Sequence, residues 1–266
     1  MQPAEARRRF AALVAVPLLN TWTDVAFKNC IFNCYFSSFN FLSIISCKKE
    51  DVQLPKADVS VIKELTDHSP IYMFYENDSL VNVNKNNAIS TTNWVFNIDK
   101  RLPLEIIIPE VMQLQFKKKN SSHKKEGAIN VFSYADSIGK NLAFLPFTDV
   151  QYKMNNEFSK FFIKKNAEAY MPYHNFTVNF NDENKITVDG NDVAKEELID
   201  FIKDFADFTS DGKTTILHLN FDKRLTYDQY IQNKILVWKL NSDKIQISSY
   251  EFIYDEKELP KCNCKL

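Results

Sequence analysis

The chain contains one six-residue phrase twice. Asn97-Ile98-Asp99-Lys100-Arg101-Leu102 recurs 123 positions later (220 − 97) as Asn220-Phe221-Asp222-Lys223-Arg224-Leu225, and the copies differ only in Ile98 against Phe221. Each copy follows an apolar, strand-like run and precedes a helix-like run. A phrase that recurs in the same local context indicates two related modules. We therefore expect a tandem architecture.

Length and composition agree with a tandem and exclude some functions. The 266 residues have room for two domains of about 100 residues each, and a hydrophobic content of 45% supplies enough apolar material for their cores. The net charge of −1 argues against a nucleic-acid partner, which requires a clustered basic excess. With 4 glycines the chain has no glycine-rich phosphate loop, so no nucleotide cofactor is expected.

The N-terminal region is typical of a targeting segment. Arginines at residues 7–9 precede an apolar run over 10–19, and Lys28 precedes a second run over 30–46. The second run contains several Asn and Ser residues and is short for a bilayer span of about 20 residues. A basic start followed by an apolar stretch favours a secretory signal. Residues 1–27 could also be an upstream extension of the reading frame.

Cys47 is the candidate lipidation site. Ile44-Ile45-Ser46-Cys47 resembles the lipobox of bacterial lipoproteins, in which the cysteine becomes the lipidated first residue of the mature protein. We therefore expect a targeting region over 1–47 and a polar tether over 48–68. The alternative is a buried cysteine that follows an apolar helix.

The first module is expected over 69–152. Its pattern predicts strands and one amphipathic helix, in the order strand 70–75, strand 80–83, strand 93–98, helix 103–118, strand 129–134 and strand 142–147. The basic stretch 117–125 is interpreted as a solvated connection in preference to a site for an anionic ligand. A bridging helix follows within 153–173.

The second module is expected over 174–256 and has the order β-β-α-β-α-β. It comprises strand 176–180, strand 185–188, a helix from an Asp192 N-cap to Phe208, strand 214–221, helix 226–240 and strand 245–254. Thr226 and Gln229 form a capping-box pattern at the start of the last helix. This order predicts a two-layer α+β fold. The first module then corresponds to a copy in which the first helix is shortened or missing, and residues 257–266, with Cys262 and Cys264, form a tail.

The second module resembles the periplasmic domain of the ExbD/TolR family over about residues 174–255. The resemblance depends on Lys185–Gly190 before the first helix and on Leu219–Asp222 before the second, with Asp222 and Tyr227 at matching positions. It implies an extracytoplasmic domain that self-associates or binds a partner beside a proton channel. Family members carry a functional aspartate in a membrane helix, and residues 30–46 contain none. The resemblance therefore extends to the extracytoplasmic domain alone.

No catalytic or metal site can be nominated. The four histidines, His68, His123, His174 and His218, have no partner at metal-ligand spacing, and the sequence has neither HExxH nor GxSxG. We therefore predict a protein that is not an enzyme and has no cofactor.

The charged residues of the repeated phrase are the candidate partner-docking residues. The carboxylates can shape a strand-to-helix turn, which is the favoured interpretation, or the charged groups can form two equivalent docking ridges. The candidates are Asp99, Lys100, Arg101, Asp222, Lys223, Arg224 and Tyr227.

The sequence favours a membrane-anchored lipoprotein that faces the periplasm. It would bind a protein or peptide of the cell envelope, for example by strand addition to a sheet edge, with a homodimer left open. The alternative is a membrane-spanning ExbD-type subunit of a proton-driven biopolymer transport complex.

Overall fold

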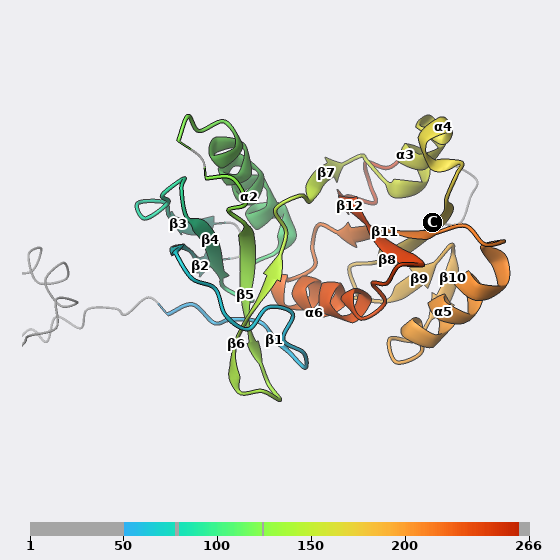
Figure 1. The fold of residues 1–266 in the computed structure, drawn as a ribbon, viewed down its shortest axis with the longest axis horizontal. Coiled ribbons are helices and arrows are strands. Elements are labelled where there is room, and N and C mark those ends of the chain that lie inside the picture. The colour runs from blue at the N-terminus through green and yellow to red at the C-terminus, as the bar shows by residue number, and fades with distance from the viewer. Residues whose placement is uncertain (1–50, 78–79, 124, 261–266) are drawn as a thin grey trace, which may run out of the picture. The chain divides into compact units, whose positions relative to one another are not determined.

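Two mixed six-stranded sheets interleaved with helices make up the described part of the chain (Figure 1). A computed structural model describes residues 51–77, 80–123 and 125–260, all of which belong to one compact unit. The expected tandem of modules built from strands and helices is confirmed. The predictions for residues 1–47, Cys47 included, and for Cys262 and Cys264 lie outside the described residues.

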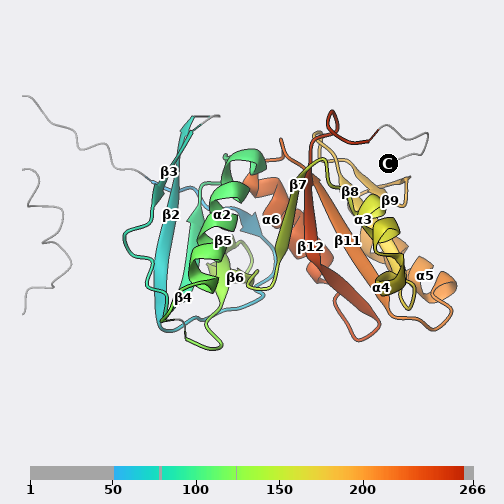
Figure 2. The ribbon, with the colours of Figure 1, turned by 90° about the horizontal axis from the view of Figure 1, so that it is seen from above.

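The first sheet carries helix α2 along one face (Figure 2). Strands β2, β4 and β5 run parallel to one another, β3 is antiparallel to β2 at one edge, and β6 is antiparallel to β5. The short β1 runs parallel to the end of β5. The elements are β1 (Lys56–Ala57), β2 (His68–Asn77), β3 (Leu80–Asn84), β4 (Asn93–Ile98), α2 (Leu104–Lys119), β5 (Asn130–Asp136) and β6 (Asn141–Pro146).

The second sheet has the order β10-β9-β8-β11-β12-β7. Strands β8, β11, β12 and β7 are parallel, and β9 and β10 continue the sheet antiparallel from β8. Helices α5 and α6 cover one face, and α3 and α4 cover the other (Figure 1). The elements are β7 (Gln151–Asn155), α3 (Ser159–Lys165), α4 (Ala167–Tyr170), β8 (His174–Phe180), β9 (Ile186–Val188), β10 (Asn191–Val193), α5 (Leu198–Thr209), β11 (Thr215–Asp222), α6 (Tyr227–Trp238) and β12 (Ile245–Tyr254).

The two sheets repeat one topology. The order β5-β4-β2-β3 in the first sheet corresponds to β12-β11-β8-β9 in the second. Tyr72 pairs with Asn97 of the first phrase, and Asn179 pairs with Asn220 of the second. Residues 85–92, between β3 and β4, form turns and bends where the second module has α5. The first module therefore lacks the first helix.

The main hydrophobic core runs through both modules, and two smaller clusters, around Phe144 and around Phe158, lie apart from it. Alternate residues of β4 and β11, such as Phe96 and Leu219, are buried against the helices, as the period of two along a strand requires. Phe132 of the first sheet packs against Tyr227 and Tyr230 of α6, with ring centroids 5.7 and 6.1 Å apart. The modules therefore share one core.

Three elements differ from the sequence-based expectations. Asp192 is not a helix N-cap: Asn191–Val193 pairs with β9 after a turn in which Gly190 has φ +85°, and α5 begins at Leu198. The region expected to be a tether contributes β1, and Ile62 pairs with Phe144 of β6. Strand β7, near the end of the expected first module, belongs to the second sheet.

Candidate functional site

The two copies of the repeated phrase meet and pair with each other. The Leu104 N–H donates to the Leu225 carbonyl at 3.0 Å, and the equivalent Tyr227 N–H donates to the Leu102 carbonyl at 2.8 Å. Pro103 and Thr226 lie opposite each other in an antiparallel bridge between these bonds. The contact is reciprocal, so the copies are related by an approximate two-fold axis.

A second pair of hydrogen bonds extends this contact. The Glu105 N–H donates to the Lys223 carbonyl at 2.9 Å, and the Asp228 N–H donates to the Lys100 carbonyl at 3.0 Å. The first N–H groups of a helix have no partner within that helix. Here each phrase supplies carbonyl acceptors to the helix of the other module. We call residues 100–105 and 223–228 the joint.

Each phrase also holds an internal carboxylate–guanidinium pair. Asp99 accepts from Arg101 Nε and Nη2, both at 2.8 Å, and Asp222 accepts from Arg224 Nε and Nη2, both at 2.9 Å. The backbone N–H of each arginine donates to the same carboxylate, at 3.1 and 2.9 Å. These bonds close the turn between strand and helix, as the structural interpretation of the phrase expects.

The pKa of Asp99 shows the balance of forces at this turn. Burial of the carboxyl group by itself would raise its pKa. Hydrogen bonds from the Arg101 guanidinium and from the backbone N–H groups of Gln53 and Arg101 outweigh burial, and the pKa of Asp99 is lowered below its usual value. The ionised carboxylate is therefore the form that the fold stabilises.

The candidate docking residues divide into two groups. Asp99, Asp222 and Tyr227 are buried, so their side chains face the interior of the protein. The exposed or half-buried basic residues form the other group, which comprises Lys100, Arg101, Lys223 and Arg224. A docking role for these basic residues stays a prediction.

A buried polar cluster, which the sequence did not reveal, links β7, α6 and β12. Tyr152 and Tyr230 lie 3.2 Å apart through their hydroxyls, and Tyr230 donates to Glu251 Oε2 at 2.6 Å. Lys234 Nζ donates to Glu251 Oε1 at 2.5 Å. Burial raises the pKa of both tyrosines well above the usual value. All four side chains are buried, and their hydrogen bonds hold the strands and helix in place.

The histidines and acids that the structure describes do not assemble a metal site. Within residues 51–77, 80–123 and 125–260, no three His, Cys, Asp or Glu side chains are grouped closely enough to hold an ion. His218 is fully buried under Tyr170, and burial lowers its pKa to about 4. Tyr170 belongs to α4, which covers this face of the second sheet and shields His218 from solvent.

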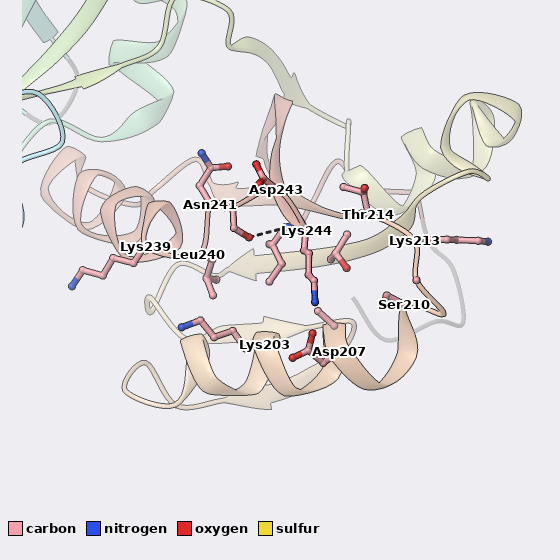
Figure 3. Close-up of a pocket in the computed structure, with 15 residues that line it drawn as sticks. Lys203, Asp207, Ser210, Lys213, Thr214, Lys239, Leu240, Asn241, Asp243 and Lys244 are labelled. Atoms are coloured by element: carbon pink, nitrogen blue, oxygen red, sulfur yellow. Dashed lines mark hydrogen bonds between the residues drawn. The ribbon is translucent and has the colours of Figure 1, made fainter.

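One cavity, of about 510 Å³, lies between α5 and the loop after α6 (Figure 3). Four lysines line it: Lys203, Lys213, Lys239 and Lys244. Lys203, Lys213 and Lys244 are exposed, and Lys239, whose side chain is 29% exposed, pairs with Asp58 at 2.7 Å. Solvated lysines near helix C-termini are favourable in themselves, so this cavity does not require a ligand.

A second cavity, of about 590 Å³, lies between α2 and β7. Met112, Gln115, Phe116 and Lys119 line it from one face of α2, since they are spaced three and four residues apart. The opposite wall comes from residues 148–152 and Ser249. We call this cavity the α2–β7 groove; its remaining lining residues are Lys118, Lys125, Ala128 and Asn130.

The groove borders an open sheet edge. In the described part of the chain β7 pairs only with β12, and no backbone hydrogen bond reaches its other edge. Phe116 is 72% exposed and Met112 is 36% exposed, so an apolar rim stands beside that edge. The cavities beside the other five-residue edge strand, β3, are lined by strand and loop residues alone.

Comparisons with known proteins identify no relative. The chain matches no protein-family model, no curated protein and no solved structure. No helix among the described residues is long and apolar enough to cross a membrane.

The two carboxylates that contact Arg224 give a matched test of the joint. Asp222→Asn should lower the free energy of unfolding by about 2 kcal/mol, because it weakens the charge-assisted hydrogen bonds of a buried carboxylate whose arginine partner is 44% exposed. Asp182→Asn should cost less than about 1 kcal/mol, since Asp182 is 38% exposed and lies 3.0 Å from the outer nitrogen of Arg224. Urea unfolding measures both. Equal, small losses would contradict the structural role of the phrase.

Proposed function

We propose that the protein is a non-enzymatic binding module of the cell envelope that takes up an extended segment of a protein partner. The observation that carries the proposal is the α2–β7 groove, in which an unpaired strand edge lies beside an exposed, partly apolar helix face. A strand that adds to such an edge gains main-chain hydrogen bonds, and its alternate side chains meet the neighbouring surface.

The walls of the groove are rigidly placed. Gln115 Nε2 donates to the Phe147 and Val150 carbonyls at 3.2 and 3.1 Å, which fixes α2 against the chain that enters β7. The hydrogen bond between the buried hydroxyls of Tyr152 and Tyr230 fixes β7 against α6. A preformed site spares the ligand the cost of ordering the protein.

The groove is long enough for a short peptide and no more. Strand β7 has five residues, which at about 3.3 Å per residue presents an edge of about 16 Å. A segment of four to six residues would therefore cover it, with the residues outside this core free to vary.

The envelope location is part of the proposal and depends on the sequence. A signal followed by the lipobox-like Ile44–Cys47 would place the folded modules outside the cytoplasm on a lipid anchor. The order of the second module is compatible with the resemblance to ExbD/TolR domains, whose extracytoplasmic domains contact partner proteins.

Phe116→Glu should weaken peptide binding at least tenfold, which is about 1.4 kcal/mol. The reason is that Phe116 is an exposed apolar side chain on the groove rim, and a carboxylate there would repel the ligand or lose its contact. Peptides selected from random libraries on the full chain provide the ligands, and fluorescence polarisation measures their affinity.

The matched control is Phe208→Glu, since Phe208 is 89% exposed on α5, outside the groove lining. Both variants should unfold at the wild-type temperature, and only the first should bind poorly. Equal affinities for the two variants, or failure of any peptide to bind, would refute the groove as the binding site.

Mass spectrometry of the protein purified from membranes tests the anchor. The expected N-terminus is a diacylglyceryl-modified Cys47, and a Cys47→Ser variant should lose the lipid mass and leave the membrane fraction. An intact N-terminus at Met1 would instead favour the membrane-spanning alternative.

A further inference from the structure

Lys118 is a buried ammonium group at the floor of the α2–β7 groove. It is 7% exposed, and its Nζ donates to Asn130 Oδ1 at 2.8 Å and to the Ile129 carbonyl at 3.3 Å. The ring of Trp94 lies 4.9 Å from the nitrogen. These partners are all neutral, so no carboxylate balances the charge of Lys118 in the described part of the chain. Burial without a counterion lowers its pKa to about 8.

The groups around Lys118 offer further donors. An ammonium has three N–H donors, and two of those of Lys118 have protein acceptors. The bond from Lys118 fixes Asn130 with its oxygen toward the lysine, so the Asn130 NH₂ group, which donates to no described residue, faces the other way. Thr148 Oγ1 accepts from the Asn130 N–H at 2.9 Å and keeps its own hydrogen to donate.

The rim of the groove is positively charged, like Lys118 itself. Lys119 and Lys125 line it together with one acid, Asp149, and Lys125 also pairs with Asp67 at 3.1 Å, so the three lysines outnumber these two acids by one. Apolar surface from Met112 and Phe116 lies beside these donors. A site that combines one desolvated cation with apolar walls complements a singly charged anion that has an apolar neighbour. A doubly charged phosphate would leave one charge in a poorly hydrated site with a single buried counterion.

We infer that the α2–β7 groove recognises the free C-terminus of a peptide whose last side chain is apolar. The terminal carboxylate accepts hydrogen bonds from Lys118 and from the donors at Asn130 and Thr148, and the last side chain packs on Phe116 and Met112. The preceding residues run along the edge of β7. Capture of a C-terminal carboxylate by fixed donors is a known mode of peptide recognition. This inference rests on the proposed function and specifies its ligand.

The groove also explains why a lysine stands at this buried position. A methionine would fill the same space without the cost of desolvating a charge. The other basic cavity, between α5 and the loop after α6, provides the contrast, because three of its lysines are exposed and the fourth, Lys239, pairs with Asp58. Of the two cavities, only the groove is lined by a buried lysine whose hydrogen-bond acceptors in the described part of the chain are all uncharged.

The decisive experiment compares acids with amides. Groove-binding peptides selected on the full chain are synthesised in pairs that differ only at the C-terminus, as a free carboxylate or a carboxamide. The acids should bind at least tenfold more tightly than the amides, and replacement of the last apolar residue by serine should weaken binding further. Isothermal titration calorimetry measures all three.

Two variants assign the effect to Lys118. Lys118→Met should bring the affinity of the acid down to that of the amide, whereas Lys244→Met, in the other cavity, should keep the wild-type preference. Thermal unfolding verifies that both variants are folded. The acid–amide comparison on the wild-type chain tests the inference even if a variant does not fold.

The outcomes separate the two proposals. If acids and amides bind equally well at the groove, the inference is overturned and the proposed function stands. A preference for acids that survives Lys118→Met also overturns the role of Lys118. If no peptide of either kind binds, the proposed function fails and the inference fails with it.

Discussion

The reciprocal backbone pairing at the joint is the contact on which the rest of the structure depends. Four hydrogen bonds, two from each module, satisfy N–H groups at the first turns of α2 and α6 with carbonyls of the opposite phrase. Helix N-termini that lie inside a protein need such partners, because an unpaired buried N–H costs about 1–3 kcal/mol. Each module therefore lacks a complete helix start without the other.

This constraint explains how two small sheets become one body. The joint holds α2 and α6 in fixed positions, and Phe132 of the first sheet then contacts Tyr227 and Tyr230 of the second module. Strand β7 joins the second sheet directly after the first module ends. The α2–β7 groove is the consequence, since one wall comes from each module. Binding at the groove would accordingly depend on the joint, although no joint residue lines it.

The tandem could be predicted from the sequence because the patterns that indicate it are local. The repeated phrase, the apolar strand-like run before each copy, and the Thr226–Gln229 capping box are short-range patterns, and the structure has each of them. The prediction of a helix N-cap at Asp192 was wrong because an acidic residue after a turn fits both a helix N-cap and a short edge strand. Pairing with β9 decides between the two.

The groove could not be predicted in this way. Its walls are separated by about thirty residues, and Lys118 belongs in the sequence to a run of three lysines that resembles a solvated helix end. What distinguishes Lys118 from the lysines on either side is its position on the buried face of α2, which it shares with Val111 and Leu114. Only the packing of α2 against β5 reveals that its charge has no counterion.

Amide hydrogen exchange at the joint tests the central claim most directly. The N–H groups of Leu104, Glu105, Tyr227 and Asp228 donate across the joint, whereas the first amides of an ordinary exposed helix have no such acceptors. Native-state exchange measured by NMR should show these four amides protected, with free energies of opening close to that of global unfolding. Rapid exchange at these amides, while the amides of β4 and β11 stay protected, would contradict the account.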